Sequence, residues 1–150
     1  MTGMLQDRVA VITGAGSGIG AGIARRFAAE GARLVLADID AAALDAIAAE
    51  LHAADAPFAS MTGDLSQEPV AGRLIALAES TYGQLDILVN NAGGGIIRPW
   101  VEHTPESLRT TIDRNLWTTV WCTWHATPRM KAGGYGRIVN IGADSVRNGL

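Results

Sequence analysis

The hydrophobic positions of this chain fall into short, nearly unbroken runs that are separated by longer segments of helical spacing. Apolar runs of about four to eight residues, bounded by turn residues, are typical of strands that are buried on both faces. The sequence predicts five such strands, at residues 8–13, 33–38, 57–61, 85–90 and 136–141.

The segments between these strands carry apolar residues at every third or fourth position, which is the spacing of a helix with one buried face. Ile19, Ile23 and Phe27 follow the first strand in this way. The longest helix is expected to run from Thr104 to about Lys131. The expected N-terminal caps are Asp40, Ser66 and Thr104, and the expected C-terminal stops are Gly31, Gly133 and Gly134.

Strands and helices therefore alternate along the whole chain. Because a right-handed crossover packs each helix back onto a parallel sheet, this alternation predicts the α/β class with helices on both faces. The specific prediction is a doubly wound parallel sheet of the Rossmann type, with strand order 3-2-1-4-5. The length of 150 residues suits one domain, spanning 1–150.

A glycine-rich turn lies directly between the first predicted strand and the first helix, at residues 13–20. Residues without a Cβ let the backbone approach a pyrophosphate, and the helix N-terminus offers free N–H groups to the anion. The glycines fit two spacings, Gly14-x-x-x-Gly18-x-Gly20 or Gly16-x-Gly18-x-x-Ala21, and spacing alone does not choose between them. A tight turn without a ligand is the structural alternative.

Asp38 ends the second predicted strand, about twenty residues beyond the glycines, where a carboxylate can accept hydrogen bonds from an adenosine ribose. The same charge would repel a 2′-phosphate, and neither Ser17 nor Ile39 supplies a compensating cation. These residues favour NAD over NADP as the cofactor. A carboxylate that only caps a turn is the alternative.

Composition and charge exclude several other classes of function. Lys and Arg total 12 against 15 Asp and Glu, a formal net charge of −3, so we expect no nucleic-acid partner. No apolar run is long enough to cross a bilayer, and we expect no membrane association and a cytoplasmic location. One cysteine, Cys122, and three scattered histidines cannot form a thiolate metal site, and we expect no metal.

At this point five segments, taken in order, resemble the short-chain dehydrogenase/reductase family. They are the turn Thr13-Gly14-x-x-x-Gly18-Ile19-Gly20, the pair Asp64-Leu65, the run Asn90-Asn91-Ala92-Gly93, Asn115 within Arg114-Asn115-Leu116, and the strand at 136–141. The resemblance selects the first of the two glycine spacings. It implies that the cofactor is bound by Gly14, Ser17, Gly18, Ile19, Gly20, Asp38, Asp64, Leu65, Asn91, Ala92 and Gly93, and that Asn115 belongs to the catalytic set.

The sequence departs from the family pattern at two places. The family's catalytic serine aligns with Ala143, so Ser145, two positions later, is the expected catalytic hydroxyl. The family's Tyr-x-x-x-Lys, which transfers the proton, is absent; the only lysine is Lys131, with Thr127 four residues before it. We therefore expect the chain to be the N-terminal, cofactor-binding part of a longer dehydrogenase, incomplete at its C-terminus and inactive alone.

Trp117, Trp121 and Trp124 form a stripe on the longest predicted helix, with Val120 beside them. Such a stripe belongs either to the core or to a contact with a second copy, since the corresponding helix of the family often packs against its copy. The resemblance therefore implies a homo-oligomer.

Three functions remain open. The main interpretation is a dehydrogenase that moves a hydride between NAD(H) and a secondary alcohol or ketone as its small-molecule substrate. Gly93 to Gly95 and the tryptophan-rich helix are similar to family members that oxidise cyclic diols or hydroxy acids. The alternatives are a 3-oxoacyl thioester reductase and a truncated, non-catalytic dinucleotide-binding protein.

Overall fold

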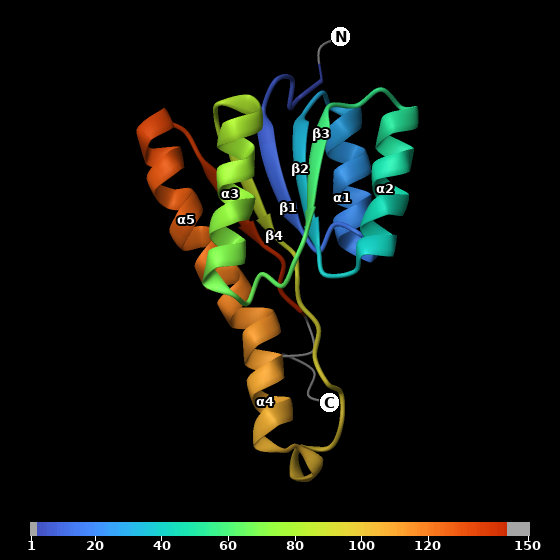
Figure 1. Ribbon diagram of the computed structural model, residues 1–150, viewed down its shortest axis with the longest axis vertical. Helices are drawn as coiled ribbons and strands as arrows, with labels where there is room; N and C mark the ends of the chain where they lie inside the picture. The colour runs from blue at the N-terminus through green and yellow to red at the C-terminus, as the bar shows by residue number, and fades with distance from the viewer. Residues whose placement is uncertain (1–2, 144–150) are drawn as a thin grey trace.

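A computed structural model describes residues 3–143 of the chain. At its centre is a parallel sheet of five strands in the order β3-β2-β1-β4-β5 (Figure 1). The strands are β1 (Val9–Thr13), β2 (Arg33–Asp38), β3 (Phe58–Thr62), β4 (Ile87–Asn90) and β5 (Arg137–Asn140). The predicted class and strand order are confirmed, and the strand bounds differ from the predicted ones by at most two residues.

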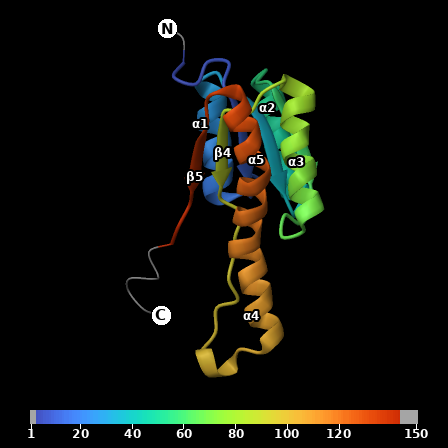
Figure 2. The ribbon, with the colours of Figure 1, turned by 90° about the vertical axis from the view of Figure 1, so that its left-hand side faces the viewer.

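Helices cover both faces of the sheet, as the alternation predicts (Figures 1 and 2). One face packs against α1 (Gly18–Ala29) and α2 (Ala41–Ala53), and the other against α3 (Glu68–Tyr82) and α5 (Thr118–Gly133). Successive residues of β1 point to opposite faces, so Val9 and Val11 lie in one core cluster while Ala10 and Ile12 lie in the other. All four are fully buried, which explains the unbroken apolar run.

Two of the three predicted helix caps are confirmed, and one is wrong. Asp40 accepts a hydrogen bond from the amide of Ala43, and Thr104 forms a reciprocal capping box with Ser107. Ser66 does not cap a helix; the N-cap of α3 is Gln67. The amide of Ser66 instead donates to the Asp64 carboxylate at 3.0 Å, which folds this serine into the turn before the helix.

The single long helix predicted from Thr104 is interrupted. It consists of α4 (Pro105–Ile112), a π-helical turn η2 (Asp113–Trp117) and α5, and it is preceded by a short 3₁₀ turn η1 (Trp100–Glu102). In Figure 2, α4 continues the line of α5 well beyond the end of the sheet. The periodicity of the sequence could not reveal the π-helical turn, because it depends on contacts with a distant loop.

β5 forms one edge of the sheet. Its side chains Ile138 and Val139 are 37% and 44% exposed, and Ile141 just beyond it is 38% exposed. In the part of the chain that the structure describes, the apolar residues of this strand are therefore only partly covered. An apolar edge of this kind favours association with other strands.

Asp86 is a buried carboxylate at the amino ends of the strands. It is 6% exposed, and its carboxylate accepts hydrogen bonds from Arg8, the backbone amide of Val9 and the side chain of Gln84, at 2.9, 2.8 and 2.7 Å. The Arg8 guanidinium also lies 4.1 Å from the ring centre of Tyr135. One carboxylate thus joins the starts of β1 and β4.

We predict that Asp86→Ala lowers the free energy of unfolding by about 1–3 kcal/mol, because it leaves the buried amide of Val9 without an acceptor. Urea denaturation would measure the change. The matched control is Asp45→Ala, which removes an exposed carboxylate from α2 and should change stability by less than about 0.5 kcal/mol. Equal stabilities of the two variants would contradict the prediction.

Candidate functional site

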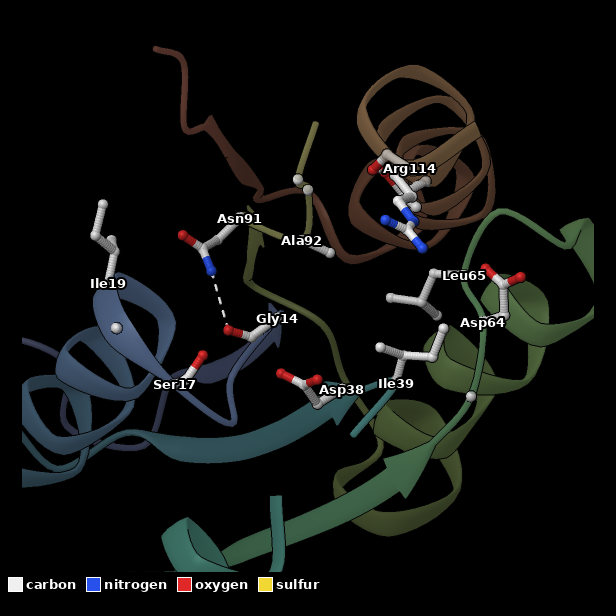
Figure 3. A pocket seen from close by; sticks show the side chains of 15 residues that line it. Gly14, Ser17, Ile19, Asp38, Ile39, Asp64, Leu65, Asn91, Ala92 and Arg114 are labelled. Carbon is white, nitrogen blue, oxygen red and sulfur yellow. Dashed lines mark hydrogen bonds between the residues drawn. The ribbon is translucent and has the colours of Figure 1, made fainter. Parts of the chain in front are cut away.

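A cavity of about 510 Å³ lies at the carboxyl ends of β1, β2 and β4 (Figure 3). Ligands of open parallel sheets bind beyond the carboxyl ends of the strands, at the point where the strand order reverses. Ten of the predicted cofactor-binding residues line the cavity: Gly14, Ser17, Gly18, Ile19, Asp38, Asp64, Leu65, Asn91, Ala92 and Gly93. The cavity is also lined by Ile39, Gly63, Gly94, Arg114 and Thr118, which the sequence did not single out.

Gly20 does not line the cavity, but it allows the cavity to form. A Cβ on Gly20 would lie 2.0 Å from the carbonyl oxygen of Gly14, and one on Gly14 would lie 2.9 Å from the Cα of Ala92. Gly14 and Gly18 also have φ angles of +63° and +50°, a region that favours glycine. The first of the two glycine spacings is therefore the one that the backbone requires.

The first turn of α1 points toward this cavity. The amides of Gly18, Ile19 and Gly20 are those that an α-helix leaves without acceptors of its own. Ser17 is the N-cap, and within residues 3–143 its hydroxyl makes no capping hydrogen bond. These donors and the positive end of the helix dipole could hold a phosphate.

Asp38 links the glycine turn to the end of β2. One carboxylate oxygen accepts from the amide of Gly16 at 2.8 Å, and the other accepts from the amide of Asp40 at 3.0 Å. A carboxylate has about four acceptor positions, so the group keeps capacity for two hydroxyl donors. Its side chain points into the cavity in Figure 3.

Thr13 and Asn91 connect the glycine turn to the end of β4. The Thr13 hydroxyl accepts from the amides of Asn91 and Ala92 at 3.0 and 2.9 Å and donates to the carbonyl of Val89 at 3.3 Å. The Asn91 side-chain amide donates to the carbonyls of Thr13 and Gly14. The Asn91 side chain therefore holds the glycine turn in place. Thr13 has the same role, which the sequence alone did not indicate.

The far end of the cavity is formed by apolar side chains and one cation. Leu65 is 4% exposed, whereas Ile39 is 67% exposed at the rim. The Asp64 carboxylate accepts from the amide of Ser66, which fixes the turn after β3. Arg114 reaches toward this end from η2 (Figure 3). The resemblance placed Asn115 near the site, and its neighbour Arg114 could have been considered on that ground alone.

Asn115 lies at the centre of the π-helical turn. Its side chain pairs with Gly94 in both directions: the amide donates to the Gly94 carbonyl and the oxygen accepts from the Gly94 amide, each at 3.1 Å. The amide also donates to the Thr111 carbonyl at 2.8 Å. These bonds assign the side chain to positioning; a catalytic role for Asn115 stays a prediction.

The other predicted catalytic residue, Ser145, lies outside the described residues. Within residues 3–143, no group of three or more His, Cys, Asp or Glu side chains is arranged to hold a metal ion. Cys122 is fully buried in the core, and burial raises the pKa of its thiol to about 12. No described helix combines the length and apolar character needed to cross a membrane.

The tryptophan stripe is divided between core and surface. Trp121 packs against the core and stacks on Trp117, with ring centres 4.9 Å apart. Trp117 is 38% exposed and Trp124 is 61% exposed. Ile112, Leu116 and Val120 add to the same exposed surface along α4, η2 and α5. The core interpretation is confirmed for Trp121, and the contact with a second copy stays a prediction.

Comparison with known proteins supports the family that the sequence motifs resemble. The model of the family described as short chain dehydrogenase matches residues 8–150. The chain is 53% identical over 148 residues to a 2,3-dihydroxy-2,3-dihydro-p-cumate dehydrogenase of Pseudomonas putida, covering 97% of this chain and 57% of that protein. It is 38% identical to a 1,6-dihydroxycyclohexa-2,4-diene-1-carboxylate dehydrogenase of Pseudomonas putida, covering 98% and 54%.

Among solved structures, a 7α-hydroxysteroid dehydrogenase complexed with NADH and 7-oxo glycochenodeoxycholic acid matches with a TM-score of 0.92 at 33% identity. That match covers 97% of this chain and 57% of the other. The chain thus spans little more than half the length of these relatives. The family match, the identities and the shared fold agree with the geometry of the cavity: the chain belongs to the short-chain dehydrogenase family.

Proposed function

We propose that this chain binds a nicotinamide dinucleotide in the cavity and forms the cofactor-binding part of a dehydrogenase that acts on a secondary alcohol. The observation that carries the proposal is the backbone cradle at Gly14 and Gly20, which only residues without a Cβ can form. The cradle lies beside the free amides of α1, where a pyrophosphate would meet donors and a positive helix dipole.

The chemistry of the remaining residues fits the rest of such a ligand. Asp38 has acceptor capacity left for the two hydroxyls of a ribose. Leu65 and Ile39 offer apolar contact for a purine beyond it. When bound, the nicotinamide ring would accept the hydride from the substrate carbon.

The charge of Asp38 supports a preference for NAD over NADP. A 2′-phosphate at the ribose would meet a carboxylate that already accepts two backbone hydrogen bonds and so remains fixed. Repulsion between the two anions would weaken binding, whereas the two hydroxyls of NAD would be accepted.

We predict that Asp38→Asn removes most of the preference for NAD. The variant loses the charge, and its single oxygen can accept from only one of the Gly16 and Asp40 amides. Affinity for NAD should fall by about 10- to 100-fold, the range expected for hydrogen bonds to a charged group. Affinity for NADP should stay the same or rise. Isothermal titration with both cofactors would measure this, with Asp45→Asn as an exposed control. A native chain that prefers NADP would refute the proposal.

The substrate that we propose is a cyclic diol. The two curated relatives act, by name, on a dihydroxy-dihydro-p-cumate and on a dihydroxycyclohexadiene carboxylate. Both names describe a ring that carries neighbouring oxygens and a carboxylate. The identity of 53% to the first supports this class over the 3-oxoacyl thioesters considered as an alternative.

Proton transfer requires a group that residues 1–150 do not contain. Tyr82 and Tyr135 have no lysine four positions later, and we propose that a Tyr-x-x-x-Lys following Leu150 completes the site. General acid–base catalysis contributes about 10²–10⁴-fold to a rate. Residues 1–150 by themselves should therefore bind the cofactor and lack measurable turnover.

The test compares these 150 residues with a chain extended through the next Tyr-x-x-x-Lys, using cyclic dihydrodiols and 3-oxoacyl thioesters as substrates. We predict NAD-dependent diol oxidation by the extended chain only. Equal turnover by both chains would mean that the active site lies elsewhere. Turnover only on thioesters would support the reductase alternative, and binding without turnover by the extended chain would support a non-catalytic protein.

We also propose that the apolar surface on α4, η2 and α5 is the contact of a homo-oligomer. Trp124 is its most exposed tryptophan, and Ile112, Leu116 and Val120 extend the surface along the same side. An exposed apolar patch that contains tryptophan favours a protein contact, because burying the indole rings removes their unfavourable contact with water.

We predict that Trp124→Glu weakens self-association of the extended chain by at least about 10-fold, because a carboxylate would be buried at the contact. Light scattering across a concentration series would measure it. Lys131→Ala changes the net charge by the same amount at the far end of α5 and serves as the control. A native protein that is monomeric at micromolar concentration would overturn the proposal.

A further inference from the structure

Arg114 is the one cavity-lining side chain that carries a positive charge, among the residues that the structure describes. Most other arginines of the chain, such as Arg25 and Arg129, pair with a carboxylate. Within residues 3–143, the Arg114 guanidinium forms neither an ion pair nor a hydrogen bond. The Arg114 side chain is exposed at the cavity, so its guanidinium is free to contact a bound ligand.

Hydrogen bonds hold the backbone around Arg114 and so fix the point from which its exposed side chain starts. Its carbonyl accepts a hydrogen bond from the hydroxyl of Thr118 at 2.8 Å. The next residue, Asn115, is joined to Gly94 by two hydrogen bonds. The π-helical turn is thereby fixed to the loop after β4, and it directs Arg114 over the mouth of the cavity. Turns of this type often occur at functional sites.

Apolar side chains and the Asp64 carboxylate lie around Arg114 in the cavity (Figure 3). In Figure 3 the side chains of Leu65 and Ile39 lie below the guanidinium, and Asp38 lies beyond them. Ile39, which is exposed, and Leu65, which is nearly buried, line the same cavity as Arg114. The space between an apolar surface and a planar cation suits a flat aromatic ring.

We propose that Arg114 stacks on the adenine ring of the bound dinucleotide and so contributes to cofactor affinity. This inference rests on the proposed cofactor binding and assigns a residue to its adenine end. A guanidinium plane stacks favourably on aromatic faces and on nucleobases. The alternative partner, a 2′-phosphate, is disfavoured because Asp38 occupies the ribose position and Ile39 and Leu65 are drawn between it and Arg114 (Figure 3).

The experiment measures dissociation constants of the 150-residue chain for NAD, ADP-ribose and nicotinamide mononucleotide at constant ionic strength. We expect Arg114→Ala to weaken NAD and ADP-ribose by the same factor, about 3- to 30-fold. Binding of nicotinamide mononucleotide, which lacks the adenine, should not change. Arg109→Ala, on an exposed face of α4, removes the same charge outside the cavity and should leave all three values unchanged.

Two further variants separate stacking from charge. Arg114→Phe keeps a flat face without the charge and should restore much of the affinity lost in Arg114→Ala. Arg114→Lys keeps the charge without the flat face and should restore less. Rescue by lysine but not by phenylalanine would indicate a phosphate contact and overturn the proposal, as would an Arg114→Ala variant that binds NAD normally. A native chain that binds none of the three ligands would overturn the proposed function as well.

Discussion

The cavity depends on how closely the first turn of α1 approaches the loop that precedes it. Gly20 touches the carbonyl of Gly14, and Gly14 touches the backbone of Ala92, so three segments meet with no room for a side chain. The Thr13 hydroxyl and the Asn91 amide then join two of these segments, the glycine turn and the loop after β4, by hydrogen bonds. The ligand-binding edge of the sheet is therefore a feature of tight backbone packing, to which polar side chains are added.

Charge alternates along the cavity, and this order gives the site its direction. The N-terminus of α1 is the positive end of a helix dipole, Asp38 is an anion, and Arg114 is a cation beyond it. A ligand with phosphates, ribose hydroxyls and a purine in sequence would meet a suitable partner at each position. In the reverse orientation the free amides of α1 would face an uncharged purine instead of the phosphates. This alternation supports the proposed orientation of the dinucleotide.

The sequence predicted the sheet well because strands buried on both faces leave unbroken apolar runs, as at Val9 to Thr13. The glycine-rich turn and the strand-end position of Asp38 indicated the cavity, and the family resemblance supplied the glycine spacing and the remaining cavity-lining residues. The sequence failed where tertiary contacts decide local structure. Asp64 captures the amide of Ser66 and moves the cap to Gln67, and the pairing of Asn115 with Gly94 converts a regular helix into a π-helical turn. Arg114 was missed because its position depends on that turn.

The pairing of Asn115 with Gly94 also has a consequence for motion. The backbone N–H and C=O of Gly94 both bond to the Asn115 side chain. The loop after β4 and the junction of α4 with α5 therefore cannot separate gradually. A local opening that frees the loop must release the helix junction in the same event. The two segments should therefore behave as one cooperative unit in amide hydrogen exchange, although they are twenty-one residues apart in sequence.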